Sequence, residues 1–202
     1  MISSVVRQWE EHNGRRALAI WLTGLPASGK STLARKLEQA LYQKGIPCYV
    51  LDGDVLRKGL NKDLGFSPED RRENIRRAGE VAKVLVDAGL LVIAAFISPY
   101  TVDRSRARSL FQQDRFYEVF VDCPPDTCEQ RDPKGHYRQA RSGRLTSFTG
   151  VSAPYEAPRS ADLVVPTGKL TITESSERLL KFILERSRIQ PTHSGETLPA
   201  KT

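Results

Sequence analysis

Residues 17–31 read ALAIWLTGLPASGKS, and this stretch decides the fold class. Its first part, Ala17–Thr23, is an almost continuous apolar run, which is typical of a strand buried on both faces of a sheet. A glycine-rich turn follows. Beyond the turn, Leu33, Leu37 and Leu41 recur at four-residue spacing, which predicts an amphipathic helix. Strand, glycine-rich turn and helix together predict the first unit of a parallel α/β sheet.

The turn GLPASGKS at Gly24–Ser31 matches the pattern GxxxxGK[ST] in the context that this pattern requires. Its glycines let backbone N–H groups curl around phosphate oxygens at a helix N-terminus. Lys30 would reach the β- and γ-phosphates, and the Ser31 hydroxyl would bind Mg²⁺. The alternative, a tight glycine turn that binds no ligand, does not explain why Lys30 and Ser31 stand at these positions. The sequence therefore predicts a site for a nucleoside triphosphate and Mg²⁺ formed by Gly24, Leu25, Pro26, Ala27, Ser28, Gly29, Lys30, Ser31 and Thr32.

Apolar runs at Cys48–Leu51, Leu90–Ile97, Tyr117–Val121 and Leu163–Val165 predict four more strands. The segments between them carry helical periodicity, so we expect a parallel sheet with helices on both faces. Two helices are well marked in the sequence. One runs over Pro68–Ala88, with Ser67 as N-cap and Asp70 as capping-box acid, and the other over Glu174–Ser187.

The length of 202 residues, with 39% hydrophobic and 27% charged residues, fits one globular domain. We expect this domain to span residues 1–189 and the tail 190–202 to be flexible. The segment 131–158 is polar and rich in Pro, Gly and Arg without clear structure, so it is either a mobile lid or a disordered insert. The longest apolar run, Gly89–Ile97, is far below the roughly 18 to 20 residues of a membrane helix, and no signal peptide is evident. We therefore expect a cytoplasmic protein that does not bind membranes.

Cysteine and histidine usage argues against two further classes. Cys48, Cys123 and Cys128 form neither an even set nor a CxxC pair, so we expect free thiols and no disulfide scaffold. The three histidines are widely separated, which disfavours a transition-metal site. The net charge of +7 suggests polyanionic partners, either nucleotides or nucleic acid.

Two carboxylates, Asp52 and Asp54, follow the second predicted strand, at the sheet edge where open α/β folds bind ligands. They could hold Mg²⁺ through water or accept a proton from an attacking hydroxyl. The alternative is a solvated turn with Asp54 capping the next helix. Asp122, which ends a later strand, is a rival metal ligand or another turn cap.

A basic stretch begins after this turn. Arg71 and Asn74 are three residues apart on one helical face, and with Arg57 they could clamp a dianion, because guanidinium groups bind phosphate and sulfate oxygens bidentately. The alternative is an ordinary solvated charged face.

The sequence resembles the adenosine 5′-phosphosulfate kinase (adenylyl-sulfate kinase) family in six blocks that follow the family order. They are GLPASGKST at Gly24–Thr32, LDGDVLRKGLNKDLGFSPEDRRENIRR at Leu51–Arg77, AAFISPY at Ala94–Tyr100, VFVDCP at Val119–Pro124, EQRDPKG at Glu129–Gly135 and FTGVSAPYEAP at Phe148–Pro158.

The resemblance implies a P-loop kinase with a mobile lid that phosphorylates the 3′-hydroxyl of adenylyl sulfate with MgATP. It implies that Arg57, Arg71 and Asn74 hold the phosphosulfate and that Phe66 and Phe148 sandwich the adenine. Ile97 and Lys134 would complete the acceptor pocket. Lys30, Asp52 and Asp54 would be catalytic, with Ser31 and Asp52 on Mg²⁺ and Asp54 accepting the hydroxyl proton. Ser98 stands where a phosphoserine intermediate is described for the family, and we favour direct transfer instead.

The lid departs from the family pattern at His136, Gln139, Arg144 and Thr146, which puts its closing contacts in question. We expect a homodimer, with association with an ATP sulfurylase left open. Three alternatives compete with this assignment: a kinase for another small metabolite, a nucleic-acid-binding module, and a catalytically silent subunit of a sulfate-activating complex.

Overall fold

The computed structural model describes residues 4–112 and 114–188. A five-stranded sheet of order β2-β3-β1-β4-β5 lies at its centre, and every neighbouring pair of strands is parallel. The strands are β1 Ala19–Thr23, β2 Cys48–Asp52, β3 Leu91–Ala95, β4 Phe116–Asp122 and β5 Leu163–Pro166. The predicted parallel α/β sheet is confirmed, and all five predicted strands are present.

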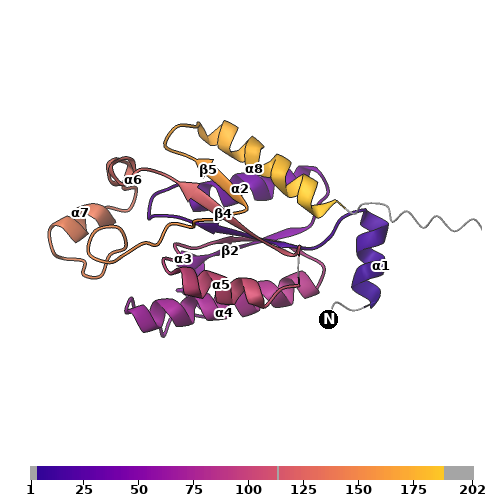
Figure 1. Ribbon diagram of the computed structural model, residues 1–202, viewed down its shortest axis with the longest axis horizontal. Coiled ribbons are helices and arrows are strands. Elements are labelled where there is room, and N and C mark those ends of the chain that lie inside the picture. Colours follow the sequence, from indigo (N-terminus) through magenta and orange to yellow (C-terminus); the bar gives the residue numbers. More distant parts are fainter. Residues whose placement is uncertain (1–3, 113, 189–202) are drawn as a thin grey trace, which may run out of the picture.

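Helices cover both faces of the sheet (Figure 1). One face packs against α2 (Lys30–Gln43) and α8 (Ile172–Ser187), and the other against α4 (Pro68–Asp87) and α5 (Thr101–Ser109). Along β1, Ile20 and Leu22 enter the core under α2 and α8, whereas Ala19 and Trp21 enter the core under α4 and α5. Because both faces of this strand are buried, its sequence is apolar from Ala19 to Leu22.

Side-chain caps set where the long helices begin. The Ser67 hydroxyl accepts from the backbone N–H of Asp70 at 3.1 Å, which starts α4 at the predicted residue. A full capping box starts α8: the Thr171 hydroxyl accepts from the Glu174 N–H at 3.2 Å, and the Glu174 carboxylate accepts from the Thr171 N–H at 2.8 Å. This cap adds residues before Glu174, so the predicted start of that helix was late.

Shorter helices lie at the two ends of the sheet (Figure 1). α1 (Ser4–Asn13), which the sequence reading did not predict, lies beyond the amino ends of the strands and is held by Glu10, whose carboxylate pairs with Arg115 at 2.5 Å. At the carboxyl ends lie α3 (Gly53–Leu56), α6 (Pro125–Arg131) and α7 (His136–Arg141). None of the described helices is long and apolar enough to cross a membrane.

The segment expected to lack clear structure contains α7, which corrects that part of the prediction. The Asp132 carboxylate accepts from the backbone N–H groups of Tyr137 and Arg138, each at 3.1 Å, and so caps the helix from outside its first turn. Tyr137 is buried against Phe148, which gives the helix a packed side. The predicted tail 190–202 lies outside the described residues.

Candidate active site

The predicted phosphate loop connects β1 to α2 at the carboxyl edge of the sheet. Gly24 has a φ of +156°, and a Cβ at this position would lie 2.6 Å from the carbonyl oxygen of Val121 on β4. Gly29, with a φ of 103°, is the N-cap of α2 and makes no side-chain cap bond. The first N–H groups of α2 therefore face the loop without a capping side chain, as a phosphate site requires.

Lys30 lies folded into this loop and is only 8% exposed. Its ammonium donates to the carbonyl oxygens of Gly24 at 2.8 Å and Leu25 at 2.6 Å, and to the Ser28 hydroxyl at 3.2 Å. Burial lowers the pKa of Lys30 to about 8, although nearby thiols and carboxylates, including Asp52, act in the opposite direction. An anion in the loop would replace these neutral acceptors and restore the lysine's usual pKa.

The acidic turn begins α3. Asp52 is the N-cap residue, since its carboxylate accepts from the Asp54 N–H at 2.9 Å. The alternative that Asp54 caps this helix is therefore wrong, because Asp52 is the N-cap residue. The Asp54 carboxylate is 60% exposed and forms an ion pair with Lys134, which lies in the 131–158 segment. The structure thus brings together Asp54 and Lys134, two residues that the sequence analysis assigned to different roles.

The residues around the turn fit a hard cation. The charges of Asp52 and Asp54 both act on Lys30, which places them near the start of α2, where Ser31 lies. Carboxylate and hydroxyl oxygens suit Mg²⁺, which normally keeps waters and phosphate oxygens as further ligands. Within residues 4–112 and 114–188 no group of three or more His, Cys, Asp or Glu could hold a metal. The rival carboxylate Asp122 ends β4, on the other side of β1 from β2.

The guanidinium groups of Arg57 and Arg71 form a partly buried pair. Arg57 donates to the carbonyl oxygens of Leu64 at 3.1 Å and Gly65 at 2.8 Å. Burial lowers the pKa of both arginines, and the charge of Arg71 lowers the pKa of Arg57 further. Two cations that repel each other in a partly buried place favour an anion between or beside them. The third predicted member, Asn74, is buried, and its side-chain carbonyl accepts from Asn61 at 3.0 Å.

The two predicted adenine-binding aromatics have different surroundings. Phe66 is 54% exposed, with the Arg57 guanidinium 4.4 Å from its ring centroid. Phe148 is 8% exposed and packs edge-to-face on Tyr137, with centroids 5.0 Å apart. Arg71 joins the two segments: it donates to the carbonyl oxygen of Phe66 at 3.0 Å and to the residues on either side of Phe148, the Ser147 carbonyl and the Thr149 hydroxyl.

Ile97 and Ser98 follow β3 at the same edge of the sheet. The carbonyl oxygen of Ile97 accepts from the Thr23 hydroxyl at 2.8 Å. Ser98 is 1% exposed, has a φ of +40°, and its hydroxyl accepts from the Trp21 indole N–H at 3.2 Å. A buried hydroxyl that already has a partner is poorly placed to meet a solvent-borne phosphate.

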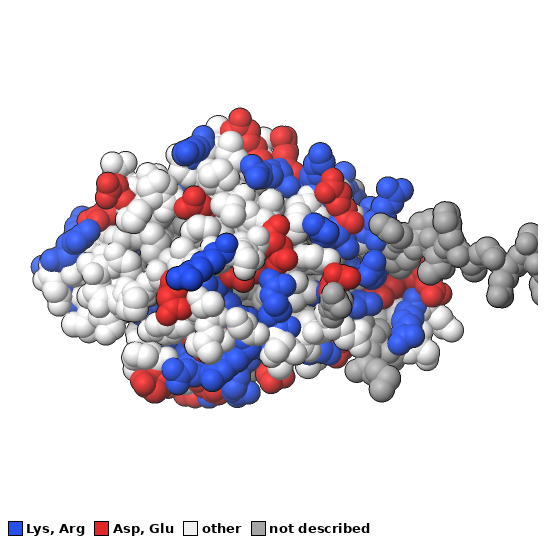
Figure 2. Space-filling view, in the orientation of Figure 1, with Lys and Arg blue, Asp and Glu red and all other residues white. Residues whose placement is uncertain are grey.

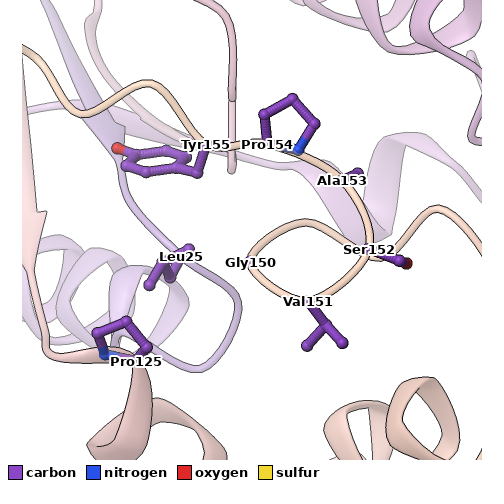
Figure 3. A pocket seen from close by; sticks show the side chains of 8 residues that line it. All are labelled: Leu25, Pro125, Gly150, Val151, Ser152, Ala153, Pro154 and Tyr155. Carbon is purple, nitrogen blue, oxygen red and sulfur yellow. The ribbon is translucent and has the colours of Figure 1, made fainter.

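The segment 131–158, for which a lid was predicted, contacts the phosphate loop. The Tyr137 hydroxyl donates to the Pro26 carbonyl at 3.1 Å, and Gly150 lies against Leu25. The four residues that depart from the family pattern, His136, Gln139, Arg144 and Thr146, are all exposed. Between the lid and the loop lies a cavity of about 560 Å³ (Figure 3), lined by Leu25, Pro125, Gly150, Val151, Ser152, Ala153, Pro154 and Tyr155.

Sequence reasoning missed several residues that hold this edge together. Thr23 and Tyr155 share a 3.0 Å hydrogen bond, and the Tyr155 ring stacks on Phe120. Arg104 on α5 donates to Ser98 and to Glu156. Tyr155 and Glu156 stand within a quoted family block, so the resemblance could have drawn attention to them. Nothing in the local sequence distinguishes Arg104 from the other arginines of its helix.

The family model described as adenylylsulphate kinase matches residues 16–166. The chain is similar to the adenylyl-sulfate kinase of Geotalea uraniireducens, with 56% identity over 177 residues that make up 88% of this chain and 85% of that one.

Two solved structures are also similar. The APS kinase of Mycobacterium tuberculosis, solved in complex with AMPPNP and APS, superposes with a TM-score of 0.80 at 47% identity, over 84% of this chain and 98% of that one. The hexameric APS kinase of Thiobacillus denitrificans superposes with a TM-score of 0.64 at 31% identity, over 85% of this chain and 29% of that one.

Proposed function

The chain belongs to the adenylyl-sulfate kinase family, and we propose that it transfers the γ-phosphoryl group of ATP to the 3′-hydroxyl of adenylyl sulfate. The observation that carries this proposal is a convergence at one edge of the sheet. The phosphate loop after β1, the acidic turn after β2 and the Ile97–Ser98 segment after β3 all meet there. Donor, metal and acceptor elements are thus adjacent, as direct transfer between two nucleotides requires.

The loop Gly24–Thr32 binds the triphosphate of ATP. Lys30 exchanges its carbonyl partners for phosphate oxygens, which removes much of the electrostatic cost of its burial. Ser31 and Asp52 would hold Mg²⁺, Asp52 through water. The ion, when bound, neutralises charge on the transferred phosphoryl group.

Asp54 accepts the proton of the attacking hydroxyl. Its carboxylate is exposed and its described partner is Lys134, so an entering acceptor hydroxyl can compete for it. Lys134 also belongs to the acceptor pocket with Ile97. In this arrangement Lys134 pairs with the proposed base and lies beside the place where the acceptor hydroxyl would meet it.

Arg57, Arg71 and Asn74 recognise the phosphosulfate. The lowered pKa values of the two arginines support an anion-binding role, because a bound dianion would relieve both their burial and their mutual repulsion. Phe66 and Phe148 supply the faces for adenine. Ser98 forms no covalent intermediate: its buried, hydrogen-bonded hydroxyl supports direct transfer.

Residues 1–189 form one kinase domain, in which 131–158 is the mobile lid. We further propose that the protein is a cytoplasmic homodimer, and we leave open whether it associates with an ATP sulfurylase.

The competing functions have less support. Lys30, Asp52 and Asp54 are all present, which counts against a silent subunit. Figure 2 shows Lys and Arg interspersed with Asp and Glu on the face in view, where a nucleic-acid-binding protein would concentrate positive charge.

The test is coupled ADP release from the purified chain with MgATP and one of four acceptors: adenylyl sulfate, AMP, adenosine or gluconate. We expect turnover with adenylyl sulfate alone. Preference for gluconate or adenosine would instead show a kinase for another metabolite. ATP-independent binding to DNA that weakens steeply with salt would favour the nucleic-acid module.

A further inference from the structure

Arg104 lies almost wholly inside the protein behind the acceptor side of the site, with 2% of its surface exposed. All three guanidinium nitrogens are bonded. Nε donates to Glu118 on β4 at 2.6 Å and Nη1 to the Ser98 carbonyl at 2.8 Å. Nη2 donates to the Thr101 hydroxyl at 3.2 Å and the Glu156 carbonyl at 2.8 Å. A planar guanidinium held at every nitrogen fixes the relative positions of its partners.

One of those partners is a strained turn. Ser98 has a φ of +40°, which is unfavourable for a residue with a side chain and persists only where the surroundings hold it. Arg104 holds its carbonyl group and Trp21 holds its hydroxyl. The preceding residue, Ile97, is the proposed acceptor-pocket residue, and Thr23 fixes its carbonyl oxygen. The orientation of the Ile97 wall therefore depends on the bond from Arg104.

The other partner is the chain that returns from the lid. The Glu156 carbonyl accepts from Arg104, its N–H donates to the Pro99 carbonyl at 2.8 Å, and its carboxylate accepts from the Thr101 N–H at 2.7 Å. The neighbouring Tyr155 lines the cavity between lid and phosphate loop (Figure 3). The end of the lid and the acceptor turn are thus bound to one side chain.

We propose that Arg104 is a positioning residue that holds the Ile97–Ser98 wall of the acceptor pocket and the C-terminal end of the lid in one frame. This proposal rests on the proposed function, because the wall matters only if an acceptor binds against it. Without the guanidinium fork, the two segments keep the bonds of Glu156 to Pro99 and Thr101, but the Ser98 carbonyl loses its bond from Arg104. Acceptor binding then weakens, whereas the phosphate loop, to which Arg104 makes none of its bonds within the described residues, keeps its affinity for ADP.

Arg108 provides a matched control. It lies one turn further along α5, pairs with Asp162 at 2.5 Å, donates to the Phe116 carbonyl at 3.1 Å and approaches Glu118 at 3.9 Å. Among the residues that the structure describes, its contacts include neither Ser98 nor Glu156. Arg104→Lys and Arg108→Lys each keep a positive charge near Glu118 and each lose a guanidinium fork. Of these two arginines, only Arg104 bonds to Ser98 and Glu156, so only Arg104→Lys should disturb the acceptor wall.

The experiment measures two constants in both variants. The KM for adenylyl sulfate comes from coupled ADP release, and the Kd for ADP comes from calorimetry. We expect Arg104→Lys to raise this KM by about tenfold or more, with the Kd for ADP within about twofold of wild type. Arg108→Lys should leave both constants within about twofold. Equal KM values in the two variants, or an equal loss of adenylyl sulfate and ADP binding in Arg104→Lys, would overturn the proposal.

A spectroscopic readout separates this proposal from the proposed function. The chain has two tryptophans, and a Trp9→Phe background leaves Trp21, whose indole bonds to Ser98, as the reporter. Arg104→Lys should shift Trp21 emission and Arg108→Lys should not. If the wild type turns over no adenylyl sulfate, the proposed function fails. The Trp21 emission of Arg104→Lys still tests the positioning role: a shift shows that Arg104 holds the Ser98 turn, and an unshifted emission shows that it does not.

A second variant covers the case in which Arg104→Lys does not fold. Glu118→Gln keeps the shape and an acceptor oxygen but removes the charge that aligns Nε of Arg104. It should raise the KM for adenylyl sulfate by about threefold, with ADP affinity unchanged. A folded Glu118→Gln protein with wild-type KM would overturn the proposal in that case.

Discussion

The ammonium group of Lys134 forms an ion pair with the carboxylate of Asp54, which lies 80 residues earlier in the chain. The pair joins the lid segment to the acidic turn after β2. Both side chains are more than half exposed, at 54% and 60%, so the pair adds little to stability. Its importance is chemical, because Lys134 pairs with the carboxylate that we propose as the catalytic base.

Replacing Asp54 with Asn keeps the shape of the side chain and removes its ability to accept a proton. We expect kcat to fall by about 100-fold, the usual scale for loss of a general base, with little change in ATP affinity. Steady-state kinetics with adenylyl sulfate give both values. Glu69→Gln, the matching change at another exposed acid, is the control. An unaltered kcat in Asp54→Asn would transfer the base role to Asp52.

The pKa of Lys30, about 8, predicts that ATP binding takes up protons at alkaline pH. Above about pH 8 a growing fraction of the free protein would carry a neutral Lys30, and triphosphate oxygens would restore its charge. Calorimetry in two buffers of different ionisation enthalpy measures this uptake directly. The same titration with Lys30→Ala should show none. Identical heats in both buffers for the wild type would contradict the lowered pKa.

The same group affects stability in the absence of ATP. Between pH 8 and 10.5 the unfolded chain binds more protons than the folded protein, because the folded pKa of Lys30 is the lower one. The Lys30 contribution to the free energy of unfolding therefore rises with pH across this window. The difference in denaturant midpoint between wild type and Lys30→Ala, followed from pH 7 to 10, should shift in favour of the wild type. A constant difference would be inconsistent with this linkage.

Ser98→Ala distinguishes direct transfer from a covalent relay. We expect substantial activity in the variant, with a loss of about 1 kcal/mol in stability from the broken bond to Trp21. Wild-type protein incubated with labelled ATP alone should carry no acid-stable phosphate. Label on Ser98 that moves into product at the turnover rate would show that the hydroxyl does act as a relay.

Arg57 and Arg71 should differ in how their loss affects acceptor choice. Arg57→Ala should lower kcat/KM for adenylyl sulfate by about tenfold to hundredfold, while binding of AMP, which lacks the sulfate, changes less. Arg71→Ala should weaken both, because Arg71 also joins the segments that carry Phe66 and Phe148.

The control for both is Arg76→Ala on the same helix, which should be nearly silent because Arg76 is 57% exposed and pairs with Glu73. Equal losses in all three variants would indicate a diffuse positive field in place of specific contacts. Competition binding with AMP and adenylyl sulfate separates these outcomes.

Local sequence patterns correctly predicted the elements that follow from one simple physical rule, such as burial on both faces or a side-chain cap. The apolar run before Gly24 predicted a doubly buried strand, and the Ser67 cap predicted where α4 begins. The start of α8 was missed because its cap, Thr171, comes before the apolar face that marked the helix. α7 was missed because its capping acid, Asp132, lies in a polar segment without periodicity.

The contacts between distant segments could not be predicted in the same way. That Asp54 would meet Lys134, or that Arg71 would bridge two loops, depends on how the sheet places its loops, which no short pattern encodes. Arg104 is the clearest example. Its helix carries several arginines, and only the fold shows which of them is buried.

The close approach of Gly24 to Val121 has a consequence for synthesis on the ribosome. β1 is the central strand, and its neighbours β3 and β4 are made long after it. A nascent chain that ends before Val121 lacks the carbonyl group that lies against Gly24, so this side of the loop is not yet formed. At roughly 5 to 20 residues per second, several seconds separate the synthesis of the loop from that of Val121. We therefore expect nucleotide to assist folding during translation only after Val121, which lies beyond the midpoint of the chain, has left the exit tunnel.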